Sequence, residues 1–304
     1  MATRRHLLPQ LAIPGLNTFV LYFALPCMLY RFGAGTPIGQ LLNGPLMAVY
    51  AISALLVVAL AVTIARARGA GWNNSAFGAL VAAFPNTGFM GVPLLVALLG
   101  AGAAGPAIVT IVIDMLLTSS LCIALSRLDG ADEHGVAKAA RLALKGVVVN
   151  PLPWAIVLGA LASSVGFELY PPLMATVTLL ADAASPVALF TIGAVLARAQ
   201  LGSTRPTPLM EYGPIAMVKL VVHPLAVGGV GGAALALGLS LDRFAWTVMM
   251  LVAALPSASN VSLLAERFGA DSGRIARIIL LSTVLAFFTF SAAVAWLVPQ
   301  AALT

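Results

Sequence analysis

AAFPNTGFMGVPLL, residues 82–95, is the stretch that decides the fold, because it places prolines, glycines, an asparagine and a threonine inside a very apolar segment. It lies within 45 consecutive residues, 69–113, that carry no charge. Such a segment is typical of membrane helices, which need about 20 apolar residues to cross the hydrocarbon. The polar and helix-breaking residues at its centre therefore need an explanation of their own.

The whole chain has the composition of an integral membrane protein. Of its 304 residues, 61% are hydrophobic and 9% are charged, and the mean hydropathy is +1.04. Soluble domains carry about 25% charged residues. Apolar runs recur along the entire chain, and they do not alternate apolar and polar residues as the strands of a membrane β-barrel do. The predicted fold class is an all-α integral membrane protein that forms one membrane unit over residues 1–304.

The apolar runs predict nine membrane spans. These cover residues 9–30, 41–64, 75–99, 104–126, 147–165, 173–196, 214–239, 244–266 and 275–298. The longest connection, residues 127–146, is rich in charged residues. We interpret it as a solvated cytoplasmic connector between a first repeat, residues 9–126, and a second repeat, residues 147–298.

The positive residues predict the orientation in the membrane. Thirteen of the 16 Lys and Arg residues fall on the side of the N-terminus, whereas only Arg31 and Arg243 fall on the opposite side. Cytoplasmic loops carry the excess of Lys and Arg. We therefore expect a protein of the inner membrane with its N-terminus in the cytoplasm and its C-terminus outside. The net charge of +6 reflects this bias, so nucleic acid is not an expected partner.

Other chemistry leaves little trace in the sequence. Cys27 and Cys122 lie in separate apolar spans without a CxxC or a histidine cluster, so neither a disulfide nor a metal site is predicted. The basic start MATRRHLL is followed by an apolar stretch longer than a signal peptide has, and we interpret it as the first span. No GxSxG, HExxH or Walker sequence occurs, so neither an enzyme nor a cofactor is predicted. The glycines of GGVGGAALALG, residues 228–238, are interpreted as helix-packing residues, Gly228 and Gly232 above all.

Two segments repeat weakly in the second half of the chain. FALPCMLYRFG, residues 23–33, resembles ASPVALFTIGA, residues 184–194, and AAFPNTGFMGVPLL resembles AALPSASNVSLLAERFG, residues 253–269. The predicted spans that hold the second pair run through the membrane in opposite directions. Inverted repeats of this kind are common in secondary transporters. We expect spans 1–4 to correspond to spans 6–9, with the fifth span unpaired.

The second pair of repeated segments is expected to interrupt its two helices. An unsatisfied backbone group in hydrocarbon costs several kcal/mol, so irregular backbone survives there only when it is buried in protein or lines a wet cavity. Two interruptions at matching positions put half-helix ends face to face near the midplane, where N-terminal ends suit an anion. The alternative is that proline and glycine only kink two continuous helices, but this leaves the asparagine and the repetition unexplained.

The residues at the two interruptions are the predicted contacts of a small organic anion. They are Pro85, Asn86, Thr87 and Gly88 in the first interruption and Pro256, Ser257, Ser259 and Asn260 in the second, with Ser262 as a further candidate. The side chains of Asn86 and Asn260 each supply a carbonyl and an NH₂ group. As an alternative, each asparagine caps its own half-helix.

Four ionisable residues lie deep in predicted spans. They are Asp114, Asp182, Lys219 and His223. A charge at the bilayer centre costs about 2.5–3.5 kcal/mol on the lenient insertion scale, so such residues face a partner or a water path. Two interpretations stay open: uptake and release of a proton during transport, or a fixed ion pair that joins two helices. Lys219, which shares a helix face with His223, is also a candidate for attracting an anionic substrate.

At these residues the sequence resembles the auxin efflux carrier family, which includes plant PIN proteins and bacterial carriers for malate or malonate. The matching motifs are LNTFVLYFALP (16–26), PNTGFMGVPLL (85–95), NPLPWAIVLG (150–159), SPVALFTIGAVL (185–196) and ALPSASN (254–260). The resemblance implies two inverted five-helix repeats, a scaffold domain, and a transport domain with two crossing broken helices, usually in a dimer. LNTFVLYFALP matches the family's second helix, so we expect the first helix to be missing.

The function that the resemblance implies is that of a carrier, not an enzyme, which moves a small organic anion such as malate, malonate or auxin by alternating access. In the family, the position of Asn86 holds the crossing-site asparagine that contacts the substrate. The expected partners are the anion, protons, the lipid bilayer and a second copy of the chain. Two alternatives stay open. A sodium symporter of the bile-acid type would need an acidic residue where this chain has Ser259 and Asn260. A membrane sensor or an intramembrane enzyme is the other.

Overall fold

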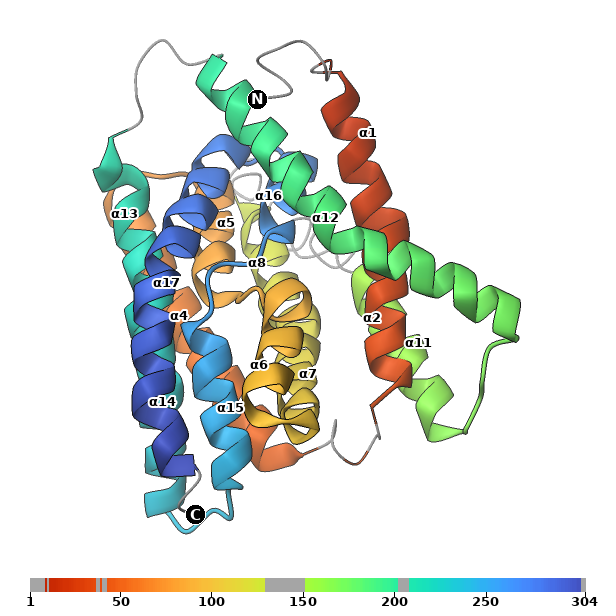
Figure 1. The fold of residues 1–304 in the computed structure, drawn as a ribbon. Coiled ribbons are helices and arrows are strands. Elements are labelled where there is room, and N and C mark those ends of the chain that lie inside the picture. The colour runs from red at the N-terminus through yellow and green to blue at the C-terminus, as the bar shows by residue number, and fades with distance from the viewer. Residues whose placement is uncertain are drawn as a thin grey trace. The chain divides into compact units, whose positions relative to one another are not determined.

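The chain is helical throughout the part that the structure describes. The computed structural model describes residues 9, 11–36, 39, 43–128, 151–201 and 208–301. Its α-helices are α1 (Ala12–Phe19), α2 (Leu25–Ala34), α4 (Gly44–Ala67), α5 (Trp72–Ala83), α6 (Val92–Leu99), α7 (Ala104–Ile113), α8 (Ser119–Leu125), α11 (Pro151–Ser164), α12 (Pro171–Leu201), α13 (Leu209–Met217), α14 (His223–Ala236), α15 (Arg243–Ala254), α16 (Asn260–Arg267) and α17 (Ser272–Ala301) (Figure 1). Among these residues there is no strand, which confirms the all-α prediction.

Short segments of altered helical pitch connect several of the α-helices. Among the described residues, four are π-helical, η1 (Val20–Ala24), η2 (Thr87–Gly91), η4 (Asp114–Thr118) and η6 (Val218–Val222), and one is a 3-10 turn, η3 (Ala101–Ala103). Single π turns inside helices are frequent at functional sites. Three of the four π segments contain a predicted site residue: Thr87, Asp114 or Lys219.

Six helical segments are long and apolar enough to cross a membrane. They are Ala12–Ala34, Gly44–Ala67, Ala101–Leu125, Pro171–Val195, Leu209–Ala236 and Ser272–Val298. Each overlaps one predicted span. The other three predicted spans contain the shorter apolar helices Thr87–Leu99, Trp154–Ser164 and Arg243–Ala254. The described part thus has the helices of a multi-pass membrane protein, whereas nine spans in inverted repeats stay a prediction. Most of the predicted connector, residues 129–146, lies outside the described residues.

The chain divides into two compact units, and each unit combines stretches that are far apart in the sequence. Unit 1 consists of Met1–Ile38, Asn150–Tyr212 and Ser259–Arg277. Unit 2 consists of Gly39–Val149, Gly213–Ala258 and Ile278–Thr304. Both units therefore draw on both halves of the chain.

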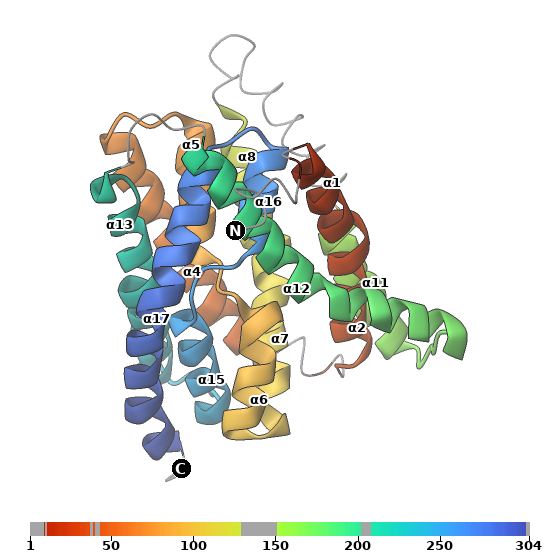
Figure 2. The same cartoon turned by 45° about the horizontal axis from the view of Figure 1, so that its top comes forward.

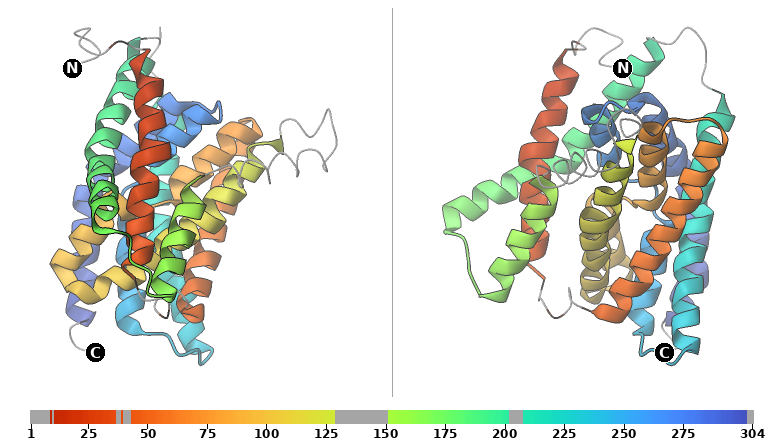
Figure 3. Two further views of the ribbon diagram at one scale, coloured as in Figure 1. Left: turned by 90° about the vertical axis from the view of Figure 1, so that its right-hand side faces the viewer. Right: turned by 180° about the vertical axis from the view of Figure 1, so that it is seen from behind.

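Unit 1 depends on a close contact between α2 and α11. A Cβ atom added at Gly33 would lie 2.5 Å from the carbonyl oxygen of Ile156, and one added at Gly159 would collide with the carbonyl oxygen of Tyr30. The two helices lie side by side, as the left view of Figure 3 shows. In a membrane, small residues at an interface let backbones approach closely enough for van der Waals attraction to hold helices together.

Unit 2 is organised around α4 and α15. Helix α4 contacts α5, α7 and α14 and lies beside α14 in the right view of Figure 3. From Thr247 to Ala254 every residue of α15 is buried, and its apolar side chains belong to a hydrophobic core cluster of the unit. The C-terminal end of α15, which precedes Pro256, is therefore held inside unit 2.

Candidate functional site

The first predicted interruption is present, but it is shorter than the two prolines predict. Helix α5 ends at Ala83, and Phe84 is extended at φ −104° and ψ 103°. A residue that precedes proline is pushed toward the extended region, and Pro85 comes directly after it. The helix resumes at Thr87 and continues through η2 and α6 to Leu99. Pro93 therefore lies within a helical run, directly after the π-helical segment η2.

The second interruption obeys the same rule. Helix α15 ends at Ala254, Leu255 before Pro256 is extended with ψ 156°, and α16 begins at Asn260. Both helices thus end at the residues that the sequence indicates.

The two interruptions are bonded to each other through the backbone. Pro85 and Ser257 form an isolated antiparallel β-bridge. The N–H of Asn86 donates to the carbonyl of Pro256 at 2.8 Å. The extended stretches after α5 and α15 can be traced side by side in Figure 2. The bridge provides partners for backbone groups that each broken helix leaves without one, which is the condition for irregular backbone at membrane depth.

Two further hydrogen bonds complete this junction. The N–H of Ala258 donates to the carbonyl of Phe84 at 2.9 Å, and the N–H of Ser257 donates to the hydroxyl of Ser282 at 3.2 Å. A Cβ atom added at Gly91 would lie 2.5 Å from a methyl group of Leu255. The glycine therefore leaves room for the side chain of Leu255 against η2.

The predicted site residues are divided between the two units. The hydroxyl groups of Thr87 and Ser257 are fully buried and have no hydrogen-bond partner among the described residues. Asn86 is half-buried. Ser259 and Asn260 are buried at the start of α16, in unit 1. A buried hydroxyl without a partner costs about 1–3 kcal/mol. The hydroxyl groups of Thr87 and Ser257 are therefore available to a bound ligand.

Asp114 is buried in unit 2 and hydrogen-bonded on both carboxylate oxygens. The hydroxyl of Tyr50 donates to one oxygen at 2.9 Å, and that of Thr118 lies 3.2 Å from the other. Asp114 begins the π-helical segment η4. Among the described residues no ion pair involves Asp114.

Lys219 lies in η6 and is fully buried. Its Nζ donates to the carbonyl of Ala253 at 2.6 Å and lies 3.1 Å from Nδ1 of His223. Ala253 belongs to the last turn of α15, whose carbonyl groups carry partial negative charge. Lys219 therefore stabilises the helix end that precedes the second interruption.

These contacts form one group, which we call the buried polar cluster: Tyr50, Asp114, Thr118, Lys219 and His223. The rings of Tyr50 and His223 connect its two halves, with centroids 5.8 Å apart. The Nε2 atom of His223 is buried without a partner among the described residues. The cluster brings together three of the four predicted ionisable residues in unit 2.

The fourth residue, Asp182, lies in unit 1. It forms a 2.8 Å ion pair with Arg31, and its side chain is 61% exposed. It is therefore not part of the buried polar cluster, and its partner is the arginine that the sequence places near the end of the first span.

Three residues of the site were not predicted from the sequence: Tyr50, Thr118 and Ser282. Tyr50 had a readable signal, because a tyrosine inside an apolar span needs a partner for its hydroxyl group. Ser282, which accepts the N–H of Ser257, is one of several serines and threonines in membrane helices, and most of these bond within their own helix, as Thr283 does. The π turns at Asp114 and Lys219 also leave no readable mark in the sequence.

Comparison with known proteins agrees with these observations. A model of the family described as "Membrane transport protein" matches residues 1–294. The "Putative malonate transporter" of Rhizobium meliloti (strain 1021) is 29% identical over 286 residues, which cover 92% of this chain and 86% of that protein. Both descriptions are of transporters and not of enzymes. The chain therefore belongs to the membrane transport protein family, the auxin efflux carrier family that its motifs resemble.

Proposed function

We propose that the chain is a secondary transporter that moves a small organic anion across the inner membrane by alternating access, and that the junction of the two interruptions binds the anion. The observation that carries this proposal is the β-bridge between Pro85 and Ser257, with the unpartnered hydroxyl groups of Thr87 and Ser257 beside it. A continuous kinked helix needs neither feature. An anion that accepts hydrogen bonds from both hydroxyl groups removes their desolvation cost.

The start of the helix after the first interruption indicates the charge of the ligand. Helical structure begins at Thr87, two residues after the bridged Pro85. The first N–H groups of a helix lack intrahelical partners and carry partial positive charge. Asn86 and Ser257 add neutral polar groups of the same unit, so a carboxylate fits this arrangement better than a cation. The name of the Rhizobium meliloti relative supports a malonate-like dicarboxylate as the first substrate to test.

The proposal assigns coupling to the buried polar cluster. Asp114 and His223 are titratable groups of the cluster, and Lys219 bonds directly to the helix end before the second interruption. A proton taken up or released in this cluster changes the charge beside that helix end, which couples protonation to the state of the site. Asp182 is bound to Arg31, and we assign it a structural role.

The division into two units supports a model for the movement. We propose that unit 1 is the scaffold and that unit 2 is the transport domain, because the β-bridge and the buried polar cluster belong entirely to unit 2. Rigid-body displacement of one domain against another is a common switching transition. The scaffold is also the proposed contact with a second copy of the chain, through the exposed apolar side of α12, where Leu179 is 73% and Phe190 50% exposed.

Flux measurements in proteoliposomes test the function. Purified protein with radiolabelled malonate, malate or indole acetate should show uptake that is lost when a protonophore collapses the pH gradient and that persists without sodium. Uptake that requires sodium would instead indicate a symporter of the bile-acid type. Zero flux of all three acids, together with no thermal stabilisation by any of them, would contradict the proposal and favour a sensor or an intramembrane enzyme.

A further inference from the structure

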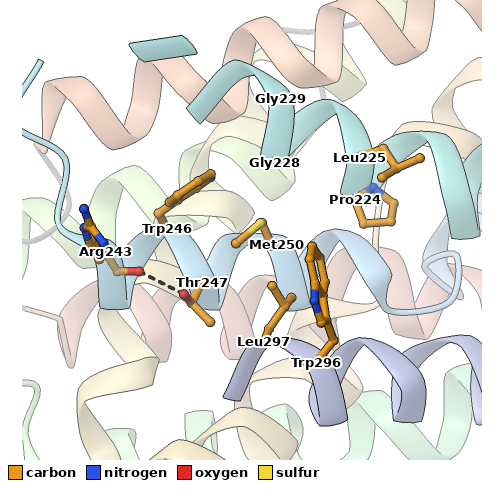
Figure 4. Close-up of a pocket in the computed structure, with 10 residues that line it drawn as sticks. All are labelled: Pro224, Leu225, Gly228, Gly229, Arg243, Trp246, Thr247, Met250, Trp296 and Leu297. Atoms are coloured by element: carbon orange, nitrogen blue, oxygen red, sulfur yellow. Dashed lines mark hydrogen bonds between the residues drawn. The ribbon is translucent and has the colours of Figure 1, made fainter. Parts of the chain in front are cut away.

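A groove of about 460 Å³ lies on unit 2 (Figure 4), and none of its lining residues belongs to the proposed anion site. It is lined by residues of three helices: Pro224, Leu225, Gly228 and Gly229 of α14, Arg243, Trp246, Thr247 and Met250 of α15, and Trp296 and Leu297 of α17. The volume is within the range of small-molecule sites, about 300–1,000 Å³.

The glycines of α14 create the floor of this groove. A Cβ atom added at Gly229 would meet nothing within 4 Å, and one added at Gly228 would lie 3.3 Å from the sulfur of Met250. The predicted packing role belongs to a neighbour: a Cβ atom added at Gly231 would collide with the indole of Trp246. Gly232 has open space around it. Gly231 thus gives room for the indole of Trp246, and Gly229 leaves the floor of the groove open beside it.

The groove is polar at one end and apolar along the rest. In Figure 4, Arg243 lies at one end, Trp246 and Thr247 come next, and Pro224 and Leu225 lie at the other end. The indole N–H of Trp246 is bonded to the carbonyl of Val227 at 3.1 Å, which fixes its ring at the wall.

Arg243 has no anionic partner in the part of the chain that the structure describes. No carboxylate there lies within 4 Å of its guanidinium group. The neighbouring carboxylate of Asp242 caps α15 instead, because it accepts the N–H of Phe244 at 3.0 Å. An exposed arginine at the mouth of an apolar groove is complementary to a ligand with an anionic head and an apolar tail.

We propose that this groove binds an anionic membrane phospholipid, with the phosphate on Arg243 and one acyl chain along Trp246, Met250 and Leu297. Arg243 is the first residue of α15 and comes after the short connection from α14, so the predicted spans place it at the membrane surface. Arginine and tryptophan are favoured at that level, where one part of a ligand is polar and the other is apolar. Trp296 is 66% and Leu225 65% exposed, so the groove is open along its side.

Native mass spectrometry of the purified, delipidated chain tests the site. Titration with dioleoyl phosphatidylglycerol should give a retained one-to-one adduct, whereas dioleoyl phosphatidylcholine should be retained more weakly. Arg243→Gln should weaken retention of phosphatidylglycerol about fivefold, and Arg243→Lys should keep most of it, as expected for one cation at a membrane surface. Gly229→Leu should abolish the adduct while Arg243 is still present, because its side chain occupies the floor.

The matched control is Arg66→Gln, which removes an exposed positive charge of unit 2 outside the groove and should leave the adduct unchanged. Thermal midpoints of all variants show whether they are folded. Equal retention of the two lipids by the unmodified chain, or unchanged retention in folded Arg243→Gln, would overturn the proposal. A shift of Gly229→Leu from dimer to monomer with intact lipid binding would also overturn it, because the groove would then hold a second copy of the chain.

Discussion

The prolines in the membrane helices behave in two ways, and the comparison locates the site. After Pro85 and Pro256 the helix does not continue directly, whereas α12 continues through Pro186 and α13 through Pro214. All four prolines lack the N–H that bonds to the carbonyl four residues earlier. Loss of this one hydrogen bond is therefore not sufficient to interrupt a helix.

The two kinds of proline differ in the residues directly after them and in the backbone segment opposite them. Asn86 and Thr87 come after Pro85, whereas Val187 and Ala188 come after Pro186. Polar side chains offer the backbone alternatives to helical hydrogen bonds, and apolar ones do not. The segments after Pro85 and Pro256 also bond to each other. Two helices interrupted together can satisfy one another, and this makes the unwound backbone tolerable inside a membrane.

The largest expected effect comes from Asn86, the polar residue that directly follows Pro85. Asn86→Ala should lower malonate flux about 100-fold, because hydrogen bonds to a charged ligand contribute about 1.5–3 kcal/mol. The variant keeps the backbone N–H of residue 86 that bonds to Pro256, and the thermal midpoint shows whether it is folded. Flux in proteoliposomes and a melting curve measure both quantities.

The matched control for this variant is Asn74→Ala, which truncates an exposed asparagine of α5 in the same unit. It should leave flux unchanged. Normal flux in Asn86→Ala would remove this residue from the site.

A smaller effect is expected from the two unpartnered hydroxyl groups. Thr87→Val and Ser257→Ala should each raise the KM for the anion about tenfold, because each removes one donor to a charged ligand. Stability should not fall, because neither hydroxyl has a partner among the described residues to lose. Loss of stability without a change in KM would show that these hydroxyl groups bond within the protein. Ser282→Ala gives the contrast, because its hydroxyl accepts the N–H of Ser257, and its loss should destabilise the junction.

The sequence was sufficient to predict these interruptions because their causes are local. Proline fixes the residue before it in the extended region, as at Phe84 and Leu255, and polar residues come soon after it. The length of the first interruption was harder to predict, because Pro93, the second proline of the segment, lies in a continuous helical run after the π-helical segment η2. The pitch of a helix depends on its packing against neighbours, which one-dimensional spacing does not show.

The partners of the site residues were harder to predict than the residues themselves. Asp114 and Lys219 stand out as ionisable residues in apolar spans, but their partners are Tyr50 and the carbonyl of Ala253. A backbone carbonyl cannot be identified as a partner from the sequence, because every residue has one. Asp182 met the same criterion and is bonded to Arg31 in unit 1, because depth along a helix does not say which side of it a residue occupies.

The buried polar cluster offers a moderate effect that separates coupling from binding. Asp114→Asn keeps an acceptor for Tyr50 but cannot titrate, and Lys219→Met removes the donor to Ala253. The midpoint of the pH profile of flux should move by about one unit in either variant, since neighbouring charges shift such groups by this much. His223 and Tyr50 are the other titratable members of the cluster. His223→Gln is therefore measured together with Asp114→Asn and Lys219→Met. Three unchanged profiles would assign the cluster a structural role.

The smallest expected effect is at the proline that does not interrupt its helix. Pro186→Ala restores an N–H to the interior of α12, where proline costs about 3 kcal/mol in an unstrained helix. The thermal midpoint should equal or exceed that of the unmodified protein, and flux should be unchanged. Pro85→Ala is the contrast: it frees Phe84 to return to the helical region, so α5 can extend into the junction, and flux should fall. If the two substitutions had the same effect on flux, the distinction between the two kinds of proline would be wrong, and the junction would owe its shape to something other than the paired interruptions.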